Sequence, residues 1–378
     1  MADIQTHLRE LGVLVGIKNK INNLGYTSNS ITTNDFCEII DSILPVNKHP
    51  LYNNIRIIAF SKSERDIIDN AFTLAKVIVE KLNFTSLDSA DWYGYESGKD
   101  EPYDIKINDK YFSLKEDSFI LENMGLYKLL NCFTGSKYKR GKRHIFEDYA
   151  PTEYNHWFDI TWQCLLSYLS ANGNLWTYTN PKNTNKQAKI SIVSNDVLLE
   201  YFDEEEHKIS KLPIKSSFKE FKRKTTPDIR EGGFSKFINE QLRSNSAYNE
   251  AQRQCAIVAS DALANELMAN LNYKAGIARF LRMHKNSYYY AKTTSSGVEL
   301  YEVPSANEID STIKITSIVG SVPSKQANIL TTVKNIKTEK TLVLRNECRF
   351  SHGQFNGTPE AKLYYEQGGS LDVIYNKI

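Results

Sequence analysis

This chain lacks the sequence features that identify several large protein classes. It has no apolar run near the roughly 20 residues that a membrane-spanning helix needs, and its N-terminus lacks the basic and then apolar pattern of a signal peptide. It also has no glycine-rich phosphate loop, which argues against an NTPase or a nucleotide-cofactor enzyme. We therefore expect a cytoplasmic protein without a membrane partner.

Paired cysteines and excess charge are absent as well. The five cysteines are scattered singly, without the spacing of metal sites, and an odd number argues against a disulfide framework. The 47 Lys and Arg residues nearly balance the 45 Asp and Glu residues, for a formal net charge of +2. Any surface that binds nucleic acid must therefore be a local one.

The most informative stretch covers residues 101–115 and reads Glu-Pro-Tyr-Asp-Ile-Lys-Ile-Asn-Asp-Lys-Tyr-Phe-Ser-Leu-Lys. Two alternating runs flank Asn108 and Asp109, and both of these residues tolerate the left-handed backbone of a tight turn. The stretch therefore predicts a β-hairpin with a two-residue turn, in which Ile107 pairs with Lys110.

This register fixes which side chains share a face of the hairpin. Asp104 opposes Ser113, and Lys115 is the diagonal neighbour of Asp104, about 7 to 8 Å away. A carboxylate and an ammonium group are therefore expected together on the polar face. The other face carries the residues that we expect in the core: Tyr103, Ile105, Ile107, Phe112 and Leu114.

A carboxylate beside a lysine suits phosphodiester hydrolysis. That reaction uses Mg²⁺ bound by hard oxygen ligands, and a lysine that orients water or stabilises charge. The pattern resembles the PD-(D/E)xK nuclease superfamily, in which an acid opens one strand and an acid-any-lysine triplet ends the next. Two departures are visible: Tyr103 separates Pro102 from Asp104, and Ser113 stands where the triplet has its acid.

The resemblance implies a set of Mg²⁺ ligands. Asp104 and the carbonyl of Leu114 would bind the metal, Lys115 would orient or deprotonate water, and Ser113 would ligate weakly or through water. Another acid must replace the missing one. The candidates lie in the loop before the hairpin, on an earlier helix and on the helix expected after Lys115: Glu96, Glu64 and Glu122. Glu64 also fits a helix capping box that begins at Ser61.

Periodicity along the chain predicts a mixed α/β protein in four parts. Residues 1–50 form an N-terminal helical segment, 51–205 a nuclease core, 206–285 a second helical segment, and 286–378 a β-rich C-terminal section that recognises DNA. In the core, a helix capped by Asp117 or Ser118 packs on the hairpin, and a strand at residues 190–193 extends its sheet. The resemblance implies a mixed sheet flanked by helices.

Two polar regions are candidates for DNA binding. A loop at residues 134–144 alternates basic residues with glycine and tyrosine, which suits contacts to backbone phosphates. Its basic residues are Lys137, Lys139, Arg140, Lys142 and Arg143. A C-terminal segment carries side chains that can bind base edges. These are Arg345, Arg349, His352, Gln354 and Asn356. Solvated loops explain both regions nearly as well.

The resemblance implies a Mg²⁺-dependent type II restriction endonuclease that cleaves a specific double-stranded DNA sequence. By analogy it would act as a homodimer in a prokaryotic cytoplasm, beside a cognate DNA methyltransferase that protects the host. Two alternatives stay open. One is a repair or recombination nuclease that recognises DNA structure. The other is a catalytically inactive DNA-binding protein, since the triplet acid is missing.

Overall fold

The computed structural model describes residues 4–94, 102–116, 118–135, 145–225, 233–271, 273–349, 355, 360–366 and 368–378. It is 46% helical and 27% strand, and strands dominate its C-terminal region. The predicted mixed α/β class with a β-rich C-terminal section is thus confirmed. In these ranges no helix is long and apolar enough to cross a membrane.

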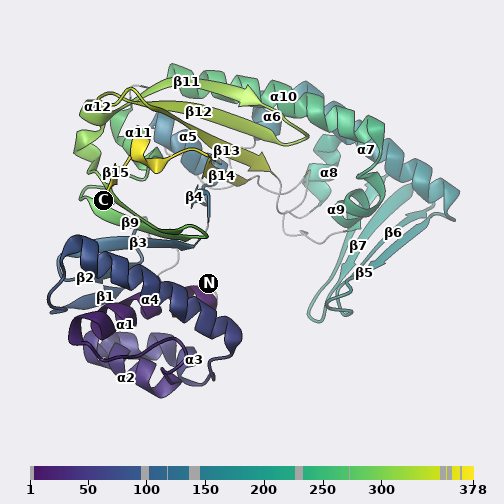
Figure 1. Cartoon of the computed structure of the whole chain (residues 1–378). Helices are drawn as coiled ribbons and strands as arrows, with labels where there is room; N and C mark the ends of the chain where they lie inside the picture. The colour runs from purple at the N-terminus through teal and green to yellow at the C-terminus, as the bar shows by residue number, and fades with distance from the viewer. Residues whose placement is uncertain are drawn as a thin grey trace.

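A six-stranded sheet of order β1-β2-β3-β9-β10-β15 carries the hairpin (Figure 1). Its strands are β1 (Ala90–Trp92), β2 (Ile105–Ile107), β3 (Lys110–Glu116), β9 (Tyr288–Thr294), β10 (Gly297–Val303) and β15 (Asn376–Lys377). We call this the hairpin sheet. Ile107 pairs with Lys110, and Asn108 has a left-handed φ of 52°. The predicted turn is therefore confirmed, and so is the predicted register from Ile105 to Ile107.

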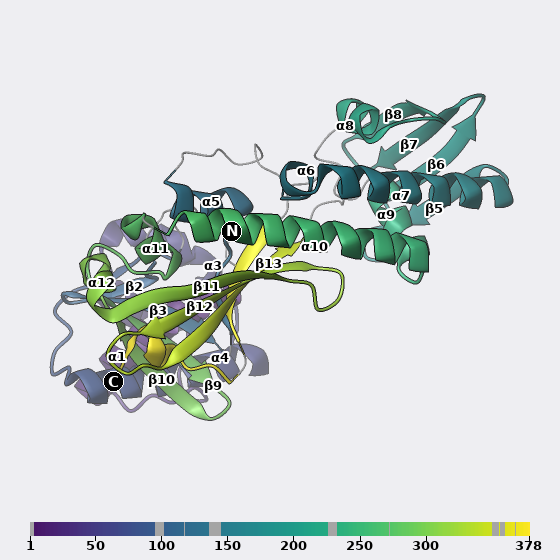
Figure 2. The same ribbon diagram turned by 90° about the horizontal axis from the view of Figure 1, so that it is seen from above.

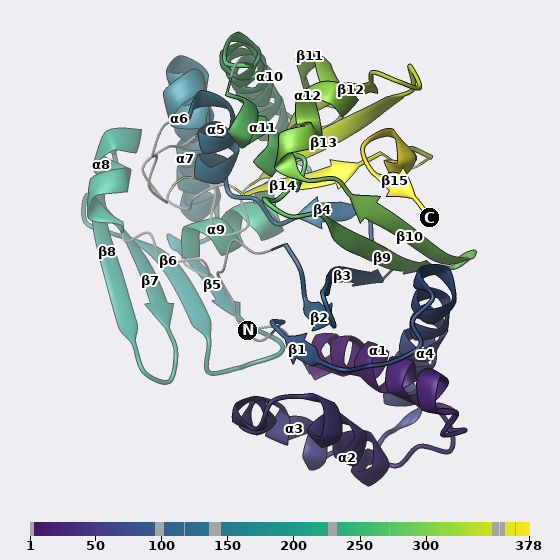
Figure 3. The ribbon, with the colours of Figure 1, turned by 90° about the vertical axis from the view of Figure 1, so that its left-hand side faces the viewer.

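An N-terminal helical layer covers one face of the hairpin sheet (Figures 1 and 3). It consists of α1 (Ile4–Asn22), α2 (Thr33–Ile43), a 3-10 turn (Val46–Tyr52), α3 (Asn53–Arg56) and α4 (Lys62–Leu82). Ile105, Ile107, Phe112 and Leu114 are buried against this layer. Four of the five side chains predicted for the hairpin core are thus placed as expected.

Helices α1 and α4 pack closely because α1 presents glycines to α4. A Cβ on Gly12 would lie 2.9 Å from the Cβ of Ala71, and one on Gly16 would lie 2.7 Å from the Cβ of Ala75. Real Cβ atoms essentially never come so close. These small residues therefore allow α1 to pack closely against α4.

A second sheet of order β11-β12-β13-β14-β4 faces the other side of the hairpin sheet (Figure 1). Its strands are β11 (Ile313–Ser321), β12 (Ala327–Asn335), β13 (Thr341–Arg349), β14 (Glu360–Tyr365) and β4 (Ile120–Glu122). The long helix α10 (Ser246–Ala269) crosses β11 and β12 (Figure 2). The shorter helices α5 (Leu126–Thr134), α6 (Ile145–Tyr149), α11 (Lys274–Phe280) and α12 (Ile309–Thr312) complete this part.

A third sheet of order β5-β6-β7-β8 extends away from the other two (Figures 1 and 2). Its strands are β5 (Leu175–Thr179), β6 (Gln187–Val193), β7 (Asp196–Phe202) and β8 (His207–Pro213). It follows helix α7 (Pro151–Ala171) and precedes α8 (Phe218–Lys224), α9 (Gly233–Phe237) and a π-helical turn (Ile238–Leu242). The strand predicted at residues 190–193 exists within β6, but its predicted place in the hairpin sheet is wrong.

The segment after the hairpin also differs from its prediction. Residues 120–122 form β4, which pairs with β14, and the helix begins only at Leu126. Buried side chains of α5 belong to the core between the two larger sheets, whereas the hairpin packs on α1 and α4. Glycine at position 125, in an extended conformation, separates the strand from the helix.

The four sequence segments do not correspond to separate layers of the fold. β9 and β10, from the segment 286–378, lie beside β3 in the hairpin sheet, and β4, from the segment 51–205, completes the C-terminal sheet. The N-terminal helices cover the hairpin itself. The boundary expected near residue 286 therefore separates strands that belong to the same sheet.

Candidate active site

Asp104 lies at the start of β2, and its carboxylate is bound by the backbone of β3. Oδ2 accepts a 2.7 Å hydrogen bond from the N–H of Leu114 and a weaker one, at 3.4 Å, from the hydroxyl of Ser113. The ammonium of Lys115 lies 3.9 Å from the same oxygen. These contacts bring together the three side chains that the register predicted on one face.

A β-bulge at Asp104 produces this arrangement. The N–H of Asp104 donates to the carbonyl of Phe112 at 2.8 Å, although Ile105 already pairs with Phe112. Asp104 and Ile105 thus both oppose Phe112, so the predicted direct pairing of Asp104 with Ser113 is wrong. The extra residue also turns the side chains before the bulge to the opposite face of the hairpin. The prediction that Tyr103 lies in the hairpin core is therefore wrong, because its ring lies 4.3 Å from that of Tyr111.

Glu10 supplies a second carboxylate that the sequence analysis did not identify. It lies on α1, is 5% exposed, and accepts a 2.8 Å hydrogen bond from the indole N–H of Trp92. Burial, and then repulsion by Asp104, raise the pKa of Glu10 to about 8, although Lys115 acts in the opposite direction. Asp104 thus lies close enough to Glu10 to disfavour the ionised form of Glu10.

One signal in the sequence could have revealed Glu10. Val13, Leu14 and Ile17 follow it at intervals of three, four and seven residues, and all three are buried. Residues at these intervals share one helix face, so the carboxylate of Glu10 belongs to an apolar stripe. A buried acid in such a stripe with a strongly raised pKa is a candidate for a functional site.

Gly94 makes room for this carboxylate. It follows β1, and a Cβ at this position would collide with both carboxylate oxygens of Glu10. The backbone at Gly94 therefore lies directly against the Glu10 carboxylate. The indole of Trp92 and Gly94 together hold the carboxylate at the end of the hairpin, toward Asp104.

The donor set fits a hard divalent cation. Asp104 and Glu10 offer carboxylate oxygens, and the carbonyl of Leu114 points to the same side of β3 as its N–H, which faces Asp104. Mg²⁺ usually binds one or two carboxylates and keeps several water ligands. A cation between Glu10 and Asp104 would also relieve the repulsion that raises the pKa of Glu10. In the described ranges no three His, Cys, Asp or Glu side chains form a ready metal cage.

The acids that the sequence suggested are engaged elsewhere. Glu64 caps α4, where the hydroxyl and backbone N–H of Ser61 donate to it and lower its pKa. Glu122 lies on β4, where burial opposes its charge, but Arg282, 3.1 Å away, and Lys128 outweigh burial and lower its pKa. Glu96 lies outside the described residues. Neither Glu64 nor Glu122 contacts Asp104 in the described part of the chain.

The predicted DNA-binding residues fall into two groups. Arg345 lies 3.0 Å from Glu366 and 3.4 Å from Glu347, and Arg349 pairs with Glu347 at 3.6 Å. Base recognition by these arginines would therefore require them to exchange partners. The remaining candidates lie outside the described residues: Lys137, Lys139, Arg140, Lys142, Arg143, His352, Gln354 and Asn356.

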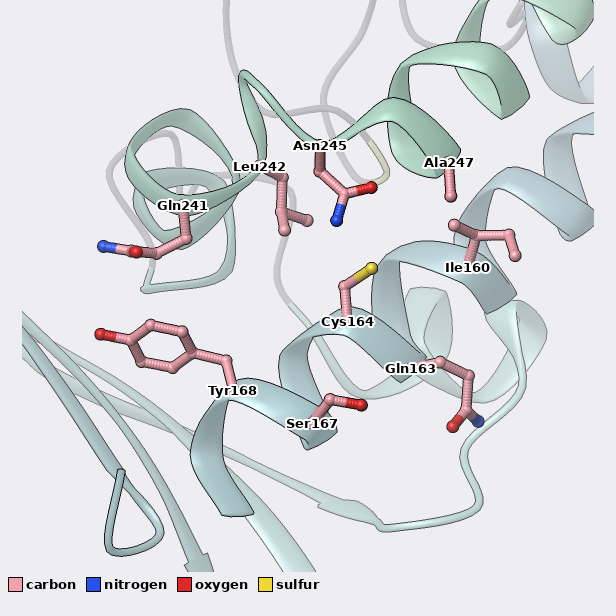
Figure 4. A pocket seen from close by; sticks show the side chains of 9 residues that line it. All are labelled: Ile160, Gln163, Cys164, Ser167, Tyr168, Gln241, Leu242, Asn245 and Ala247. Carbon is pink, nitrogen blue, oxygen red and sulfur yellow. The ribbon is translucent and has the colours of Figure 1, made fainter. Parts of the chain in front are cut away.

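A cavity of about 350 Å³ lies far from the hairpin, between α7 and the turn before α10 (Figure 4). Cys164 points into it from α7, opposite Leu242 and Asn245. Burial raises the pKa of the Cys164 thiol, which disfavours the thiolate that a nucleophile requires. Among the described residues, the titratable side chains that line this cavity are Cys164 and Tyr168, and this pair offers no competing active site.

Comparisons with known protein families, curated proteins and solved structures return no match for this chain. The geometry around Asp104 is therefore the basis for any assignment of function.

Proposed function

We propose that this protein is a Mg²⁺-dependent endonuclease that hydrolyses phosphodiester bonds in double-stranded DNA. One observation carries the proposal: Glu10, Asp104 and Lys115 converge at the bulged end of a β-hairpin. This combination of two carboxylates and a lysine suits the binding of a metal ion and of a phosphate. The resemblance of the hairpin to the PD-(D/E)xK superfamily points to the same chemistry.

In this proposal, Glu10, Asp104 and the carbonyl of Leu114 hold the metal. When bound, Mg²⁺ offsets negative charge on the phosphate and makes water more acidic. The Lys115 ammonium, with a side chain 29% exposed, can reach the phosphate or orient a water molecule toward it. The N–H of Leu114 keeps the Asp104 carboxylate in one orientation, so the site is organised before the metal arrives.

Glu10 supports catalysis over the alternative of an inactive DNA-binding protein. It provides the carboxylate that the triplet lacks, because Ser113 occupies the position of the acid. Burying a carboxylate beside another one destabilises a fold unless a cation binds there. A protein that only bound DNA would gain nothing from Glu10, and an apolar residue in its place would pack on Trp92 at no electrostatic cost.

The finer parts of the proposal rest on the resemblance alone. These are a specific recognition sequence, a homodimer, a partner methyltransferase and a prokaryotic host, as for a type II restriction enzyme. A repair nuclease with structural specificity would share the same hairpin chemistry. The products of cleavage distinguish the two, because a restriction enzyme gives fragments with defined ends.

The experiment is digestion of a long DNA of known sequence with purified protein and Mg²⁺, followed by sequencing of the fragment ends. We expect one recurrent end sequence, and no cleavage without a divalent metal. Asp104→Ala and Lys115→Ala should abolish cleavage and leave DNA binding largely intact, while Glu302→Gln, on β10, serves as the control. Unchanged cleavage by either hairpin variant would refute the proposal. DNA binding without cleavage in Mg²⁺ or Mn²⁺ would favour the inactive alternative.

A further inference from the structure

A second cavity, of about 260 Å³, lies between the hairpin sheet and the C-terminal sheet. Its walls come from β9 and β10 on one side, and from Phe119 and Tyr365 on the other. These two aromatic residues are neighbours, because the N–H of Tyr365 donates to the carbonyl of Phe119. Hydroxyl groups of the β9–β10 turn line the remaining wall, among them Thr294 and Ser296.

Lys292 is the cation of this cavity. It is 2% exposed, and its ammonium donates a 2.7 Å hydrogen bond to the hydroxyl of Tyr365. The same nitrogen lies 4.6 Å from the centre of the Phe119 ring. No carboxylate of the described residues forms a salt bridge with it. A buried ammonium costs folding stability unless something compensates it, and it has three donors to satisfy, so Lys292 can bind an acceptor in the cavity.

Glu299 places an acceptor opposite this donor. In the backbone pairing of β9 with β10, Glu299 is the cross-strand neighbour of Lys292. Its side chain also lines the cavity. A carboxylate there disfavours a phosphate or another anion as the ligand. A ligand that presents both an acceptor and a donor along one edge would satisfy Lys292 and Glu299 together.

Nucleobases have this chemistry. The hydrogen-bonding edge of each base combines acceptors with N–H donors, and the flat ring stacks on aromatic side chains. Phe119, which is 37% exposed, and Tyr365 supply aromatic surface to the cavity, with their rings tilted by 56° to each other and the Lys292 ammonium over both. The volume of about 260 Å³ lies just below the roughly 300 Å³ at which small-molecule sites begin. It therefore suits a single ring system.

The cavity lies close to the hairpin site. Lys115 and Lys292 are paired neighbours on the parallel strands β3 and β9, and β10 with Glu299 is the next strand. Since adjacent strands lie about 4.8 Å apart, Glu299 is about 10 Å from β3 across the sheet. A nucleotide held near Lys115 could therefore place its base in the cavity after leaving the duplex.

We propose that this cavity receives one nucleobase turned out of the DNA stack next to the cleaved bond. The identity of the base would then contribute to sequence selection, through Lys292 and Glu299. The inference rests on the proposed nuclease function for the source of the base, while the recognition of a base by the cavity can be measured without cleavage.

The first test measures binding of free nucleosides to the metal-free, full-length protein by saturation-transfer NMR. Guanosine, adenosine, cytidine and thymidine carry no phosphate, so the signal reports contacts with the base and the sugar. With the wild-type protein, we expect a saturation-transfer signal at the base protons of at least one nucleoside. This signal should fall by at least about fivefold in Lys292→Met and in Glu299→Gln. Glu302→Gln, on the same strand but outside the cavity, should match the wild type.

The second test uses duplexes in which each base pair beside the cut is replaced in turn by a mismatch. Turning a mismatched base out of the duplex costs less free energy than turning out a paired one. A duplex with a mismatch at one of these positions should therefore bind the wild-type protein about tenfold more tightly than the matched duplex. Glu299→Gln should lose this gain, and Glu302→Gln should keep it. Melting temperatures of all variants verify that they are folded.

The outcomes separate the two proposals. The cavity proposal is overturned if no nucleoside binds, if both cavity variants bind as the wild type does, or if no mismatch increases affinity. If nucleosides bind in the expected manner but no DNA is cleaved, the nuclease proposal fails and base recognition by the cavity is retained. Cleavage without nucleoside binding overturns the cavity proposal alone.

Discussion

The carboxylate of Glu10 fills the space that a side chain at Gly94 would occupy. Glu10 on α1 and Gly94 after β1 are distant in sequence, and they meet beside Asp104. The position of the second carboxylate thus depends on a residue without a side chain. The following predictions test this arrangement and the groups around it.

Gly94→Ala should displace Glu10, because the added methyl group collides with its carboxylate. We expect a loss of about 1 to 3 kcal/mol in the free energy of unfolding, as for other overpacked sites, and at least a tenfold loss of Mg²⁺-dependent cleavage. Urea melts and single-turnover cleavage measure the two effects. In Glu10→Ala/Gly94→Ala the loss of stability should be smaller than the sum of the single losses. Additive effects would show that the two residues do not interact.

Glu10 should make the metal-free protein less stable as the pH rises. Its pKa of about 8 lies above the ordinary value of 4.5, so between these values the folded state binds more protons than the unfolded state. The free energy of unfolding should therefore fall as pH rises through this window, by at most about 1.4 kcal/mol per pH unit. Urea melts between about pH 5 and pH 8 measure the slope, as the linkage relation requires.

Two comparisons assign this slope to Glu10. Glu10→Gln cannot ionise and should flatten it, whereas Glu302→Gln should keep the wild-type slope. Saturating Mg²⁺ should flatten it as well, because the metal stabilises the ionised form of Glu10. A stability that rises with pH in the metal-free wild type would contradict the placement of Glu10.

Glu122→Gln should lower stability and leave the chemistry of the site unchanged. Arg282 and Glu122 form a largely buried ion pair, with side chains 18% and 9% exposed. Removing one partner of such a pair typically costs about 3 to 5 kcal/mol. Cleavage per folded molecule should stay near the wild-type value at a temperature where the variant is folded. A complete loss of cleavage by the folded variant would indicate that Glu122 binds the metal after all.

Glu64→Gln tests the other acid suggested by the sequence in the same way, and we expect a smaller loss in the free energy of unfolding. Its carboxylate completes the capping box of α4 with Ser61, and glutamine can also serve at this position, so the loss should stay below the roughly 1 kcal/mol of a missing cap interaction. We expect a small fall in melting temperature and wild-type cleavage. An inactive but folded variant would contradict the structural role of Glu64.

Ser113→Ala should have little effect. The hydroxyl of Ser113 lies 3.4 Å from Asp104, near the limit of a hydrogen bond, and the N–H of Leu114 binds the same oxygen more closely. We expect cleavage within about threefold of the wild type, since a hydrogen bond of this length contributes well under 1.4 kcal/mol even when its acceptor is a carboxylate. A loss of 100-fold or more, measured in single turnovers, would identify Ser113 as a ligand.

Local patterns predicted the hairpin well. The alternation of residues and the left-handed tolerance of Asn108 fix the turn and the register, and the capping box of Ser61 and Glu64 forms as expected. These features depend on residues a few positions apart. The bulge at Asp104 does not follow from alternation, and it moved Tyr103 to the opposite face from the one predicted.

Features that depend on distant contacts could not be predicted. Residues 120–122 form a strand only because β14 lies beside them, more than 200 residues later. The strand at 190–193 pairs with its sequence neighbours, although its composition equally suited the hairpin sheet. Glu10 was missed because its value to the site comes from Asp104 and Gly94, neither of which is near it in sequence.

The parallel pairing of β3 with β9 has a consequence for synthesis of the chain. Phe112 pairs with Tyr289, so the strand that flanks the hairpin leaves the ribosome more than 170 residues after it, and β15 joins the sheet only at residues 376–377. Chains fold in the order of their emergence, as far as their contacts allow. A nascent or prematurely terminated chain therefore contains Glu10, Asp104 and Lys115 without a complete sheet to hold them. Glu10, Asp104 and Lys115 therefore have the complete hairpin sheet around them only after residue 377 has left the ribosome.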